Sequence, residues 1–203
     1  MQRLPFTLSE DLSAAVKAVR AAVAVHSVTA LPTETFYGLA VDPRDDKAVA
    51  RVFALKQRPA EKALPVVGAS TEQLAGLVCI PPLWRRRLEE VWPAPLTVVL
   101  ERAGGPGRFG SLAVRVPGHA LLRRLLAEVG PLTATSANRS GGKALASGDA
   151  VAAAFGGGVA VLLDGGVTQG GLPSTIIDGT VAPARLVRRG AFEIPGEWGV
   201  TAG

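Results

Sequence analysis

The stretch LPTETFYGLA, residues Leu31–Ala40, carries four hydrogen-bonding side chains between apolar ends, namely Thr33, Glu34, Thr35 and Tyr37. It follows SVTAL, residues 27–31, whose apolar and β-branched residues predict a buried strand. A turn after a strand explains one or two such residues, because their side chains satisfy nearby backbone groups. Four together exceed the needs of a turn, so this stretch is also a candidate functional segment.

Outward from this stretch, apolar spacing predicts alternating helices and strands. A Ser9 N-cap predicts a first helix that runs through Val23, and a second helix is expected from Asp45 to a stop before Pro59. Further helices are expected at residues 70–77, 83–91, 120–129 and 148–155. Strands are expected at residues 27–31, 64–67, 96–100, 112–116, 132–135, 159–163, 174–178 and 184–188.

Helices and strands mix throughout the chain, without an internal repeat or a linker. This pattern predicts an α/β fold built on one mixed, twisted sheet with flanking helices. The 203 residues are expected to form a single domain, with a motif-bearing core at about 8–190 and a loosely structured tail at 191–203.

Composition narrows the class of protein. Apolar residues make up 48% of the chain, which permits a sizeable core and excludes general disorder. The apolar runs are short, so no membrane span is predicted, and the start MQRLPFTLSEDL does not resemble a signal peptide. A cytoplasmic protein is therefore expected. Cys79 is the single cysteine, which excludes an internal disulfide and a cysteine-based metal site.

The charge balance is modestly basic. Lysine and arginine total 22 against 17 acids, which gives a formal charge of +5. Such an excess favours an anionic ligand such as nucleotide, phosphate or RNA, and arginine suits bidentate contacts with phosphate or carboxylate. A chain rich in arginine and alanine can equally reflect genomic base composition, so charge alone leaves the ligand open.

Three short patterns are interpreted as structural. G-x-G-x-x-G occurs at residues 105–110, but a strand rather than a helix follows it, so a hairpin loop is the better interpretation. GK at residues 142–143 resembles part of a P-loop, but Ala144 stands where Ser or Thr is required. His26 and His119 lack partners at metal-ligand spacing and are interpreted as structural or solvent-facing.

Two polar clusters follow predicted elements. The helix that starts at Asp45 ends in KQRP, which supplies Lys56 and Arg58, and Lys62 follows. These bases either complement the helix dipole or bind a polyphosphate. TATSANRSGG, residues 133–142, is either a capped turn or a polar loop at the end of a strand, where open α/β sheets bind ligands.

Three further side chains complete a cationic set. Arg115 lies in the alternating apolar strand LAVRVPG, where an unpaired charge is costly, so it faces either solvent or an anionic partner. Ser174 begins an apolar strand, and Arg188 ends the last predicted strand. The whole set lacks a nucleophile, paired catalytic acids and a metal cluster. It therefore favours phosphoryl or nucleotidyl transfer, because that chemistry depends largely on positioning and charge neutralisation.

Eight motifs at residues 31–190 occur in the order typical of one family: LPTETFYGLAVD, KQRP, WPAPLTVVL, AVRVPGH, TSANRSG, DGG, STIID and LVRRGA. The chain resembles the YrdC-like family, the threonylcarbamoyl-AMP synthases. The resemblance implies that L-threonine, bicarbonate and ATP give threonylcarbamoyl-adenylate and pyrophosphate. It also implies a twisted α/β sheet around a concave, basic cavity, and a separate transferase complex that passes the threonylcarbamoyl group to tRNA.

The resemblance also implies residue roles. The catalytic K-x-R and S-x-N signature corresponds to Lys56, Arg58, Ser136 and Asn138. The threonine contacts are expected to be Thr35, Arg115, Ser136 and Ser174. The ATP contacts are expected to be Arg58, Lys62, Ser111, Asn138, Ser147 and Arg188. Mg²⁺ is expected to arrive with ATP, held mainly by phosphates and water, and no organic cofactor is expected. Three aspartates are either metal ligands or turn and strand-end acids, namely Asp42, Asp164 and Asp178.

Some positions depart from the family pattern. Val67 stands where members often carry a histidine, KALAS at residues 143–147 replaces a Pro-Ser-Pro-Thr stretch, and Pro173 replaces an acid. The chain resembles the short form, without an additional C-terminal domain. Two alternatives therefore stay open. One is an RNA- or ribosome-binding protein that uses the same cavity, although aromatic residues are few and no RNP-like segment occurs. The other is a diverged paralogue with another acceptor.

Overall fold

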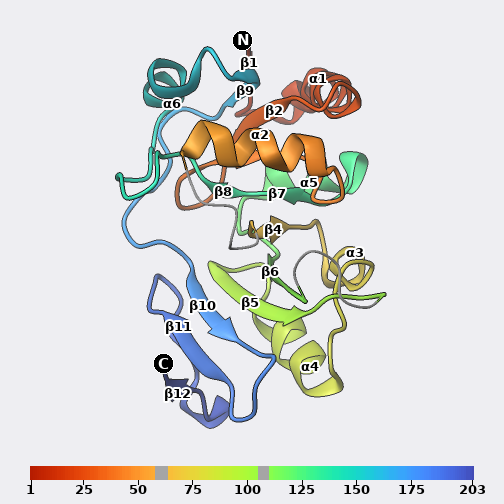
Figure 1. The fold of residues 1–203 in the computed structure, drawn as a ribbon, viewed down its shortest axis with the longest axis vertical. Coiled ribbons are helices and arrows are strands. Elements are labelled where there is room, and N and C mark those ends of the chain that lie inside the picture. The colour runs from red at the N-terminus through yellow and green to blue at the C-terminus, as the bar shows by residue number, and fades with distance from the viewer. Residues whose placement is uncertain (58–63, 105–109) are drawn as a thin grey trace.

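The computed structural model describes residues 1–57, 64–104 and 110–203 (Figure 1). Its strands are β1 (Gln2–Pro5), β2 (Val28–Pro32), β3 (Tyr37–Ala40), β4 (Val66–Val67), β5 (Leu96–Glu101), β6 (Ser111–Arg115), β7 (Leu132–Thr133), β8 (Thr135–Ser136), β9 (Val159–Asp164), β10 (Thr175–Asp178), β11 (Arg185–Arg188) and β12 (Thr201–Ala202). Its α-helices are α1 (Leu12–Ala24), α2 (Asp46–Lys56), α3 (Thr71–Ala75), α4 (Pro82–Val91), α5 (Ala120–Val129) and α6 (Gly148–Phe155). Two short 3-10 helices are η1 (Ser9–Asp11) and η2 (Gly196–Trp198). Throughout the described ranges, no helix has the length and apolar character needed to cross a membrane.

The strands form two sheets, which lie one above the other in Figure 1. The upper sheet has the order β1-β9-β2-β3-β8, and the lower sheet has the order β12-β11-β10-β5-β6-β4-β7. Both sheets combine parallel and antiparallel pairs. The expected mixed α/β fold with flanking helices is confirmed, but the expectation of one sheet is wrong.

The division between the sheets falls inside the strand expected at residues 132–135. Ala134 separates β7, which pairs with β4 in the lower sheet, from β8, which pairs with β3 in the upper sheet. Gly38 of β3 passes so close that a Cβ there would lie 3.4 Å from the Ala134 Cα. A single strand-like run of sequence therefore serves two sheets, because the backbone changes partner at one residue.

The stretch Leu31–Ala40, quoted above, contains the turn of a hairpin whose two arms are β2 and β3. The two strands pair antiparallel, with Pro32 opposite Tyr37. The sequence pattern missed β3, because all four of its residues are buried and the strand shows no polar alternation. The four polar residues therefore occupy the turn and the first position of β3.

The N-terminal region differs from expectation in two ways. β1 was not predicted, since it is a short and mostly exposed strand that is recognised only by its parallel pairing with β9. Ser9 does not cap α1, because it lies within η1. The carboxylate of Asp11 instead accepts hydrogen bonds from the backbone N–H groups of Thr7 and Leu8, each at 2.8 Å.

The second helix confirms its expected start and stop. The carboxylate of Asp45 accepts from the backbone N–H groups of Lys47 and Ala48, at 3.0 and 3.2 Å, and so caps α2. The helix ends at Lys56, where Gln57 adopts a left-handed φ of 50°. The other predicted helices and strands have counterparts whose ends differ by at most two residues.

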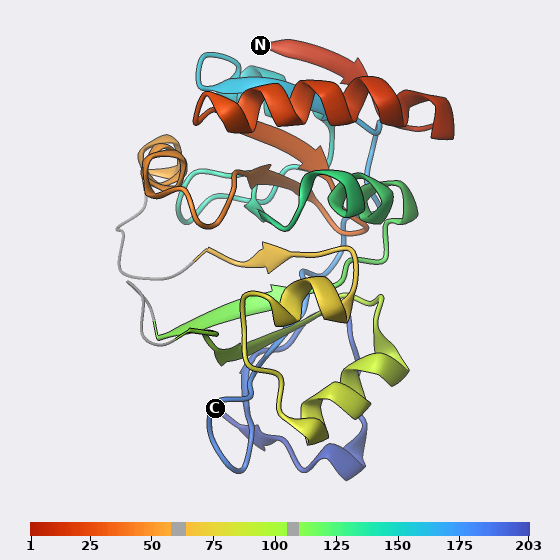
Figure 2. The ribbon, with the colours of Figure 1, turned by 90° about the vertical axis from the view of Figure 1, so that its right-hand side faces the viewer.

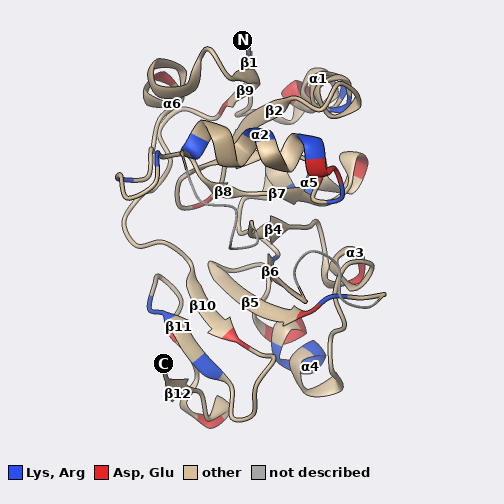
Figure 3. Cartoon of the chain, in the orientation of Figure 1, with Lys and Arg blue, Asp and Glu red and all other residues tan. Residues whose placement is uncertain are grey.

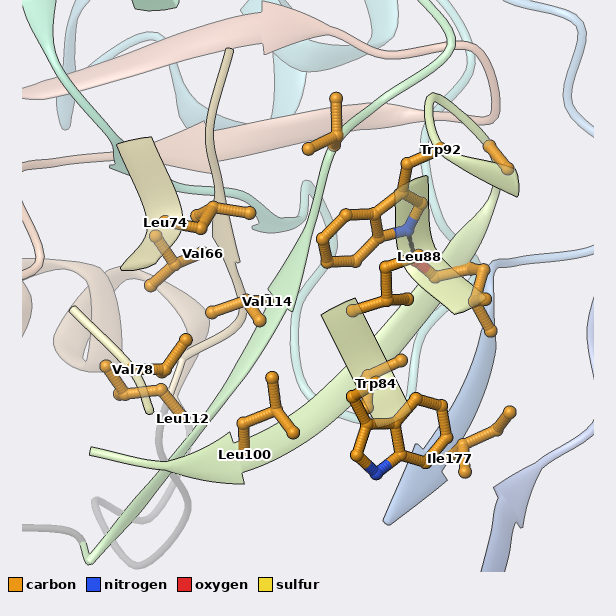
Figure 4. Close-up of a cluster of buried hydrophobic side chains, with 14 of the residues drawn as sticks. Val66, Leu74, Val78, Trp84, Leu88, Trp92, Leu100, Leu112, Val114 and Ile177 are labelled. Atoms are coloured by element: carbon orange, nitrogen blue, oxygen red, sulfur yellow. Dashed lines mark hydrogen bonds between the residues drawn. The ribbon is translucent and has the colours of Figure 1, made fainter. Parts of the chain in front are cut away.

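The C-terminal tail is ordered, so the expectation of a loose tail is wrong. η2 is followed by β12, which pairs parallel with β11 at the edge of the lower sheet. Trp198 is 6% exposed, and its ring lies edge-on to Trp84 of α4 at a centroid distance of 5.8 Å. Figure 4 shows part of this cluster, in which Trp84, Leu88 and Ile177 pack beside the lower sheet.

The helices of the upper half form two separate cores. In the first, Val19 of α1 packs with Leu122 and Leu126 of α5, and in the second, Phe53 of α2 packs with Phe155 of α6. Figure 2 shows α1 across the top of this upper half, α5 below it on the right, and α2 at the left edge. The first of these cores also includes Val67 of β4 and Leu132 of β7, so it joins the upper half to the edge of the lower sheet.

Candidate functional site

A cavity of about 750 Å³ lies between the two sheets. The lower wall is the face of β5, β6, β10 and β11, and the upper wall is the turn before β3 together with the loop that follows β8. Figure 3 shows basic residues on β11, on α2 and on the loop between β8 and α6. Among the described residues that line the cavity, Arg115, Lys143 and Arg188 are the cations, and none is an aspartate or glutamate.

The two threonines of the opening stretch have different roles. Thr33 Oγ1 donates to the carbonyl of Phe36 at 2.7 Å and accepts from the backbone N–H groups of Thr35 and Phe36, so it braces the turn. Thr35 is 8% exposed, and its hydroxyl lies 3.1 Å from that of Thr33 in the cavity wall. The predicted threonine contact Thr35 therefore lines the cavity.

Glu34 is the anionic partner of Arg115. Glu34 Oε1 lies 3.3 Å from Arg115 Nη1, and the two side chains are 17% and 8% exposed. Burial lowers the pKa of the Arg115 guanidinium, and the charge of Glu34 opposes that shift. Within the described part of the chain, neither carboxylate oxygen of Glu34 accepts a geometrically aligned hydrogen bond. The pair is therefore held mainly by its charges.

Tyr37 locks the start of β3 to the end of β9. Its hydroxyl donates to the carbonyl of Gly166 at 2.8 Å and accepts from the N–H of Gly165 at 3.0 Å. Burial raises the pKa of this hydroxyl to about 12, and the nearby carboxylate of Asp164 adds to the shift. Because Tyr37 also lines the cavity, it joins the upper wall to the segment that crosses to the lower sheet.

Ser174 and Arg188 form a network on the lower wall. Thr97 Oγ1 donates to Ser174 Oγ at 2.9 Å, and the guanidinium of Arg188 donates to the Ser174 carbonyl at 2.8 and 3.1 Å. Desolvation lowers the pKa of Arg188, and the positive charge of Arg115 adds to this. Two guanidinium groups that affect each other across one cavity favour an anion between them.

The S-x-N signature residues line the upper wall, with Lys56 behind them. Lys56 is 3% exposed, and its ammonium donates to the Ser136 carbonyl and to the carbonyl and side-chain oxygens of Asn138, the last two at 2.9 and 3.1 Å. Ser136 Oγ donates to Asn138 Oδ1 at 2.6 Å. Lys56 does not itself line the cavity, so in this structure it orders the loop that does.

The other predicted ATP contacts divide into two groups. Ser111 and Ser147 are described, but neither lines the cavity. Ser147 caps α6 by accepting from the Ala150 N–H at 3.3 Å, while Ser111 begins β6, two residues before Ala113 on the cavity face. Arg58 and Lys62 lie outside the described residues.

The three aspartates that were candidate metal ligands each contact an arginine or threonine side chain. Asp42 pairs with Arg44, Asp164 pairs with Arg3, and Asp178 accepts from Thr180. No group of three or more His, Cys, Asp or Glu that could hold a metal ion occurs in the described chain. These aspartates therefore match the turn and strand-end alternative rather than a protein-held metal site.

The two histidines that were interpreted as structural make hydrogen bonds beside the starts of helices. His26 Nδ1 lies 2.5 Å from Asp45 Oδ2, and His119 Nδ1 accepts from the Leu122 N–H at 3.2 Å at the start of α5. Burial lowers the pKa of His119. Of the glycine pattern, residues 105–109 lie outside the described residues, but β5 and β6 pair antiparallel as the two arms of the expected hairpin.

Three features in or beside the cavity were not predicted. Thr97 was missed, although a hydroxyl inside the apolar strand LTVVL is a signal for a buried polar partner. Glu34 was left without a definite role, although a buried Arg115 required an anion. Lys143 was set aside with the P-loop fragment, yet it lines the cavity. The cavity combines anion-binding groups and hydroxyls, which suits orientation of charged substrates.

The chain is similar to proteins of known sequence and structure. The family model Sua5/YciO/YrdC, described as telomere recombination, matches residues 22–190. The chain is 43% identical to the threonylcarbamoyl-AMP synthase of Chromohalobacter salexigens over 75% of this chain and 85% of that protein. It is 38% identical to the protein of the same name from Vibrio cholerae, over 84% of this chain and 94% of that protein. The structure of Pyrococcus abyssi Sua5 complexed with L-threonine has a TM-score of 0.88 and 32% identity, and the match covers 100% of this chain but only 62% of that one. The chain belongs to the Sua5/YciO/YrdC family.

Proposed function

We propose that this chain is an L-threonylcarbamoyladenylate synthase, a nucleotidyltransferase that makes threonylcarbamoyl-AMP and pyrophosphate from L-threonine, bicarbonate and ATP. The observation that carries the proposal is the cavity, in which Arg115 and Arg188 share one wall with Ser174 and face the S-x-N loop. The names of the relatives from Chromohalobacter and Vibrio support the same activity.

The amino acid is assigned to the end of the cavity that contains Arg115. Its guanidinium, fixed by Glu34, would bind the threonine carboxylate, and Ser174, Thr35 and Ser136 would contact the rest of the substrate. Val67 lies beside Arg115 in the sheet register and is 2% exposed in the cavity wall. The histidine often found there in the family is therefore replaced by an apolar contact, which would suit the threonine methyl group.

The nucleotide is assigned to the space between the S-x-N loop and Arg188. Asn138 and Arg188 line that space, and Lys56 orders the loop from behind. By family resemblance, Arg58, Lys62, Ser111 and Ser147 would complete the ATP contacts. The catalytic assignment of Lys56, Arg58, Ser136 and Asn138 rests on the same resemblance.

The reaction needs positioning more than covalent catalysis. The threonine ammonium first releases a proton, and the resulting amine combines with bicarbonate to give a carbamate and water. A carbamate oxygen then attacks the α-phosphorus, the bond to the β-phosphate oxygen breaks, and pyrophosphate leaves. Fixed cations contribute by neutralising charge that develops on the phosphates, and a closed cavity contributes by aligning the reactants.

Mg²⁺ is proposed as a companion of the nucleotide. The described cavity lining contains no carboxylate that could bind it, so these residues do not form a protein-held magnesium site. The phosphates of ATP and water would hold the ion instead. We place the reaction in the cytoplasm, where a separate transferase complex would pass the product to tRNA.

The test measures pyrophosphate release with ATP, L-threonine and bicarbonate, each omitted in turn, together with a threonine-labelled adenylate. Ser136→Ala is the informative variant, because Ser136 is exposed and its loss should leave the fold intact. We expect kcat/KM to fall by about tenfold, the effect of one lost hydrogen bond to substrate. Ser140→Ala is the matched control on the same loop, since Ser140 does not line the cavity.

The outcomes separate the alternatives. Pyrophosphate release that requires threonine and bicarbonate, and that falls in Ser136→Ala but not in Ser140→Ala, supports the synthase. Release that requires another amino acid in place of threonine supports a diverged paralogue with another acceptor. Absence of release with all three substrates, together with tRNA binding, supports the RNA-binding alternative.

A further inference from the structure

Lys143 is a cavity cation that the expected site residues do not include. It lies on the loop between β8 and α6, residues 137–147, where Figure 3 shows basic residues, and it is exposed at the cavity wall. Within the described part of the chain, it makes no hydrogen bond or ion pair. A free ammonium beside a polar cavity is a strong point charge for a phosphate.

The other two cations that line the cavity already have partners. Arg115 is paired with Glu34 at 3.3 Å, and Arg188 donates two hydrogen bonds to the Ser174 carbonyl. Their charges are therefore partly compensated or directed toward the lower wall. Of the cations that line the described cavity, Lys143 alone makes neither a hydrogen bond nor an ion pair.

The backbone on both sides of Lys143 is fixed. Asn138 Nδ2 donates to the Gly142 carbonyl at 2.8 Å and to the Arg139 carbonyl at 2.9 Å. The Gly142 N–H donates to the same Arg139 carbonyl at 2.9 Å, in a turn that requires glycine at residue 141, where φ is +78°.

The chain beyond Lys143 is held as well. The Leu145 N–H donates to the Ala137 carbonyl at 3.1 Å, and the Leu145 carbonyl accepts from the Tyr37 N–H at 2.9 Å. The loop therefore presents Lys143 at the cavity wall on a fixed backbone. Only the side chain itself needs to be ordered when a ligand binds.

We propose that Lys143 binds the terminal phosphates of the nucleotide and the pyrophosphate that leaves. The inference rests on the proposed function for the identity of the nucleotide, but it concerns phosphate binding, which is measurable without any reaction. A cation in this place gives the polyphosphate a contact on the upper wall, opposite the two arginines. AMP, which carries the α-phosphate alone, does not reach this contact.

Isothermal titration of the full chain with inorganic pyrophosphate, ATP and AMP tests the proposal. Lys143→Ala should weaken binding of pyrophosphate and ATP by about fivefold, the effect of one partly exposed ion pair, and leave the AMP Kd within about twofold. Lys143→Arg should restore most of the affinity. Lys47→Ala is the control, because Lys47 is an exposed lysine on α2 outside the cavity lining, and it should change none of the three affinities.

Each result decides the proposal. A pyrophosphate Kd that Lys143→Ala leaves unchanged overturns it, as does equal weakening for AMP and ATP, which would indicate a displaced loop. Failure of the unaltered protein to bind pyrophosphate overturns it too. A pyrophosphate affinity that depends on Lys143 in a chain without synthase activity supports this inference and rejects the proposed function. If the chain has synthase activity and the Lys143→Ala variant binds pyrophosphate normally, the proposed function is supported and this inference is rejected.

Discussion

Replacing Glu34 by glutamine should destabilise the fold, because it leaves a buried guanidinium without its counter-charge. Glu34 Oε1 and Arg115 Nη1 are 3.3 Å apart, and the side chains are 17% and 8% exposed. At an effective dielectric constant of about 20, unit charges at this distance attract by about 5 kcal/mol. Desolvation of the carboxylate opposes part of that attraction, and removal of one partner from a buried pair typically costs about 3–5 kcal/mol. We expect Glu34→Gln to lower the free energy of unfolding by about 3 kcal/mol.

The assay is urea denaturation at pH 7, followed by circular dichroism. Glu90→Gln is the matched control, since Glu90 is an exposed glutamate on α4 and its loss should change stability by less than about 0.5 kcal/mol. A double-mutant cycle with Arg115→Met isolates the pair, because the double variant removes both charges. We expect a coupling free energy of at least about 2 kcal/mol.

Two results would refute this reasoning. One is a Glu34→Gln variant that loses less than about 1 kcal/mol, which is the value expected for an exposed ion pair. The other is additivity of the two single variants, because independent contributions would mean that the two charges do not stabilise each other. In either case Glu34 would not hold Arg115 in place. The proposed contact between Arg115 and the threonine carboxylate would then lose the support of this ion pair.

Two further predictions concern Tyr37 and Trp198. Burial raises the Tyr37 pKa from 10.0 to about 12, so the folded state keeps a proton that the unfolded chain releases. The stability that this shift contributes is complete below pH 10 and is lost as pH rises from 10 through 12, by at most about 3 kcal/mol. Tyr37→Phe should lack that fall in alkaline denaturation curves, and parallel curves for the two proteins would contradict the prediction. Trp198→Ala should lower the free energy of unfolding by about 3 kcal/mol, because the ring packs on Trp84 and beneath the Arg87 guanidinium. Val181→Ala, at an exposed position, is its control in urea denaturation, and an equal effect of both changes would mean that the tail is not packed.

Local signals in the sequence account for much of the secondary structure. Asp45 caps α2 with its own side chain, so a short segment was enough to predict where that helix begins. The apolar runs at β5 and β6 likewise predicted a hairpin, because both strands and the connection between them are close in sequence. The order of the motifs indicated the family, and the family model matches the chain.

The tertiary structure decided which residues meet. β1 and β12 are strands only because of the distant strands beside them, and residues 132–135 divide between two sheets because their partners differ. The same holds for the site, where Glu34 meets Arg115 and Lys56 meets Asn138 across long stretches of chain.

The physical reason is that hydrogen-bonding capacity belongs to each residue, whereas its partner depends on how the sheets fold together. The sequence determined that Thr33, Glu34, Thr35 and Tyr37 needed polar partners. Only the fold assigned them separately to a turn, a buried arginine, the cavity and the end of β9.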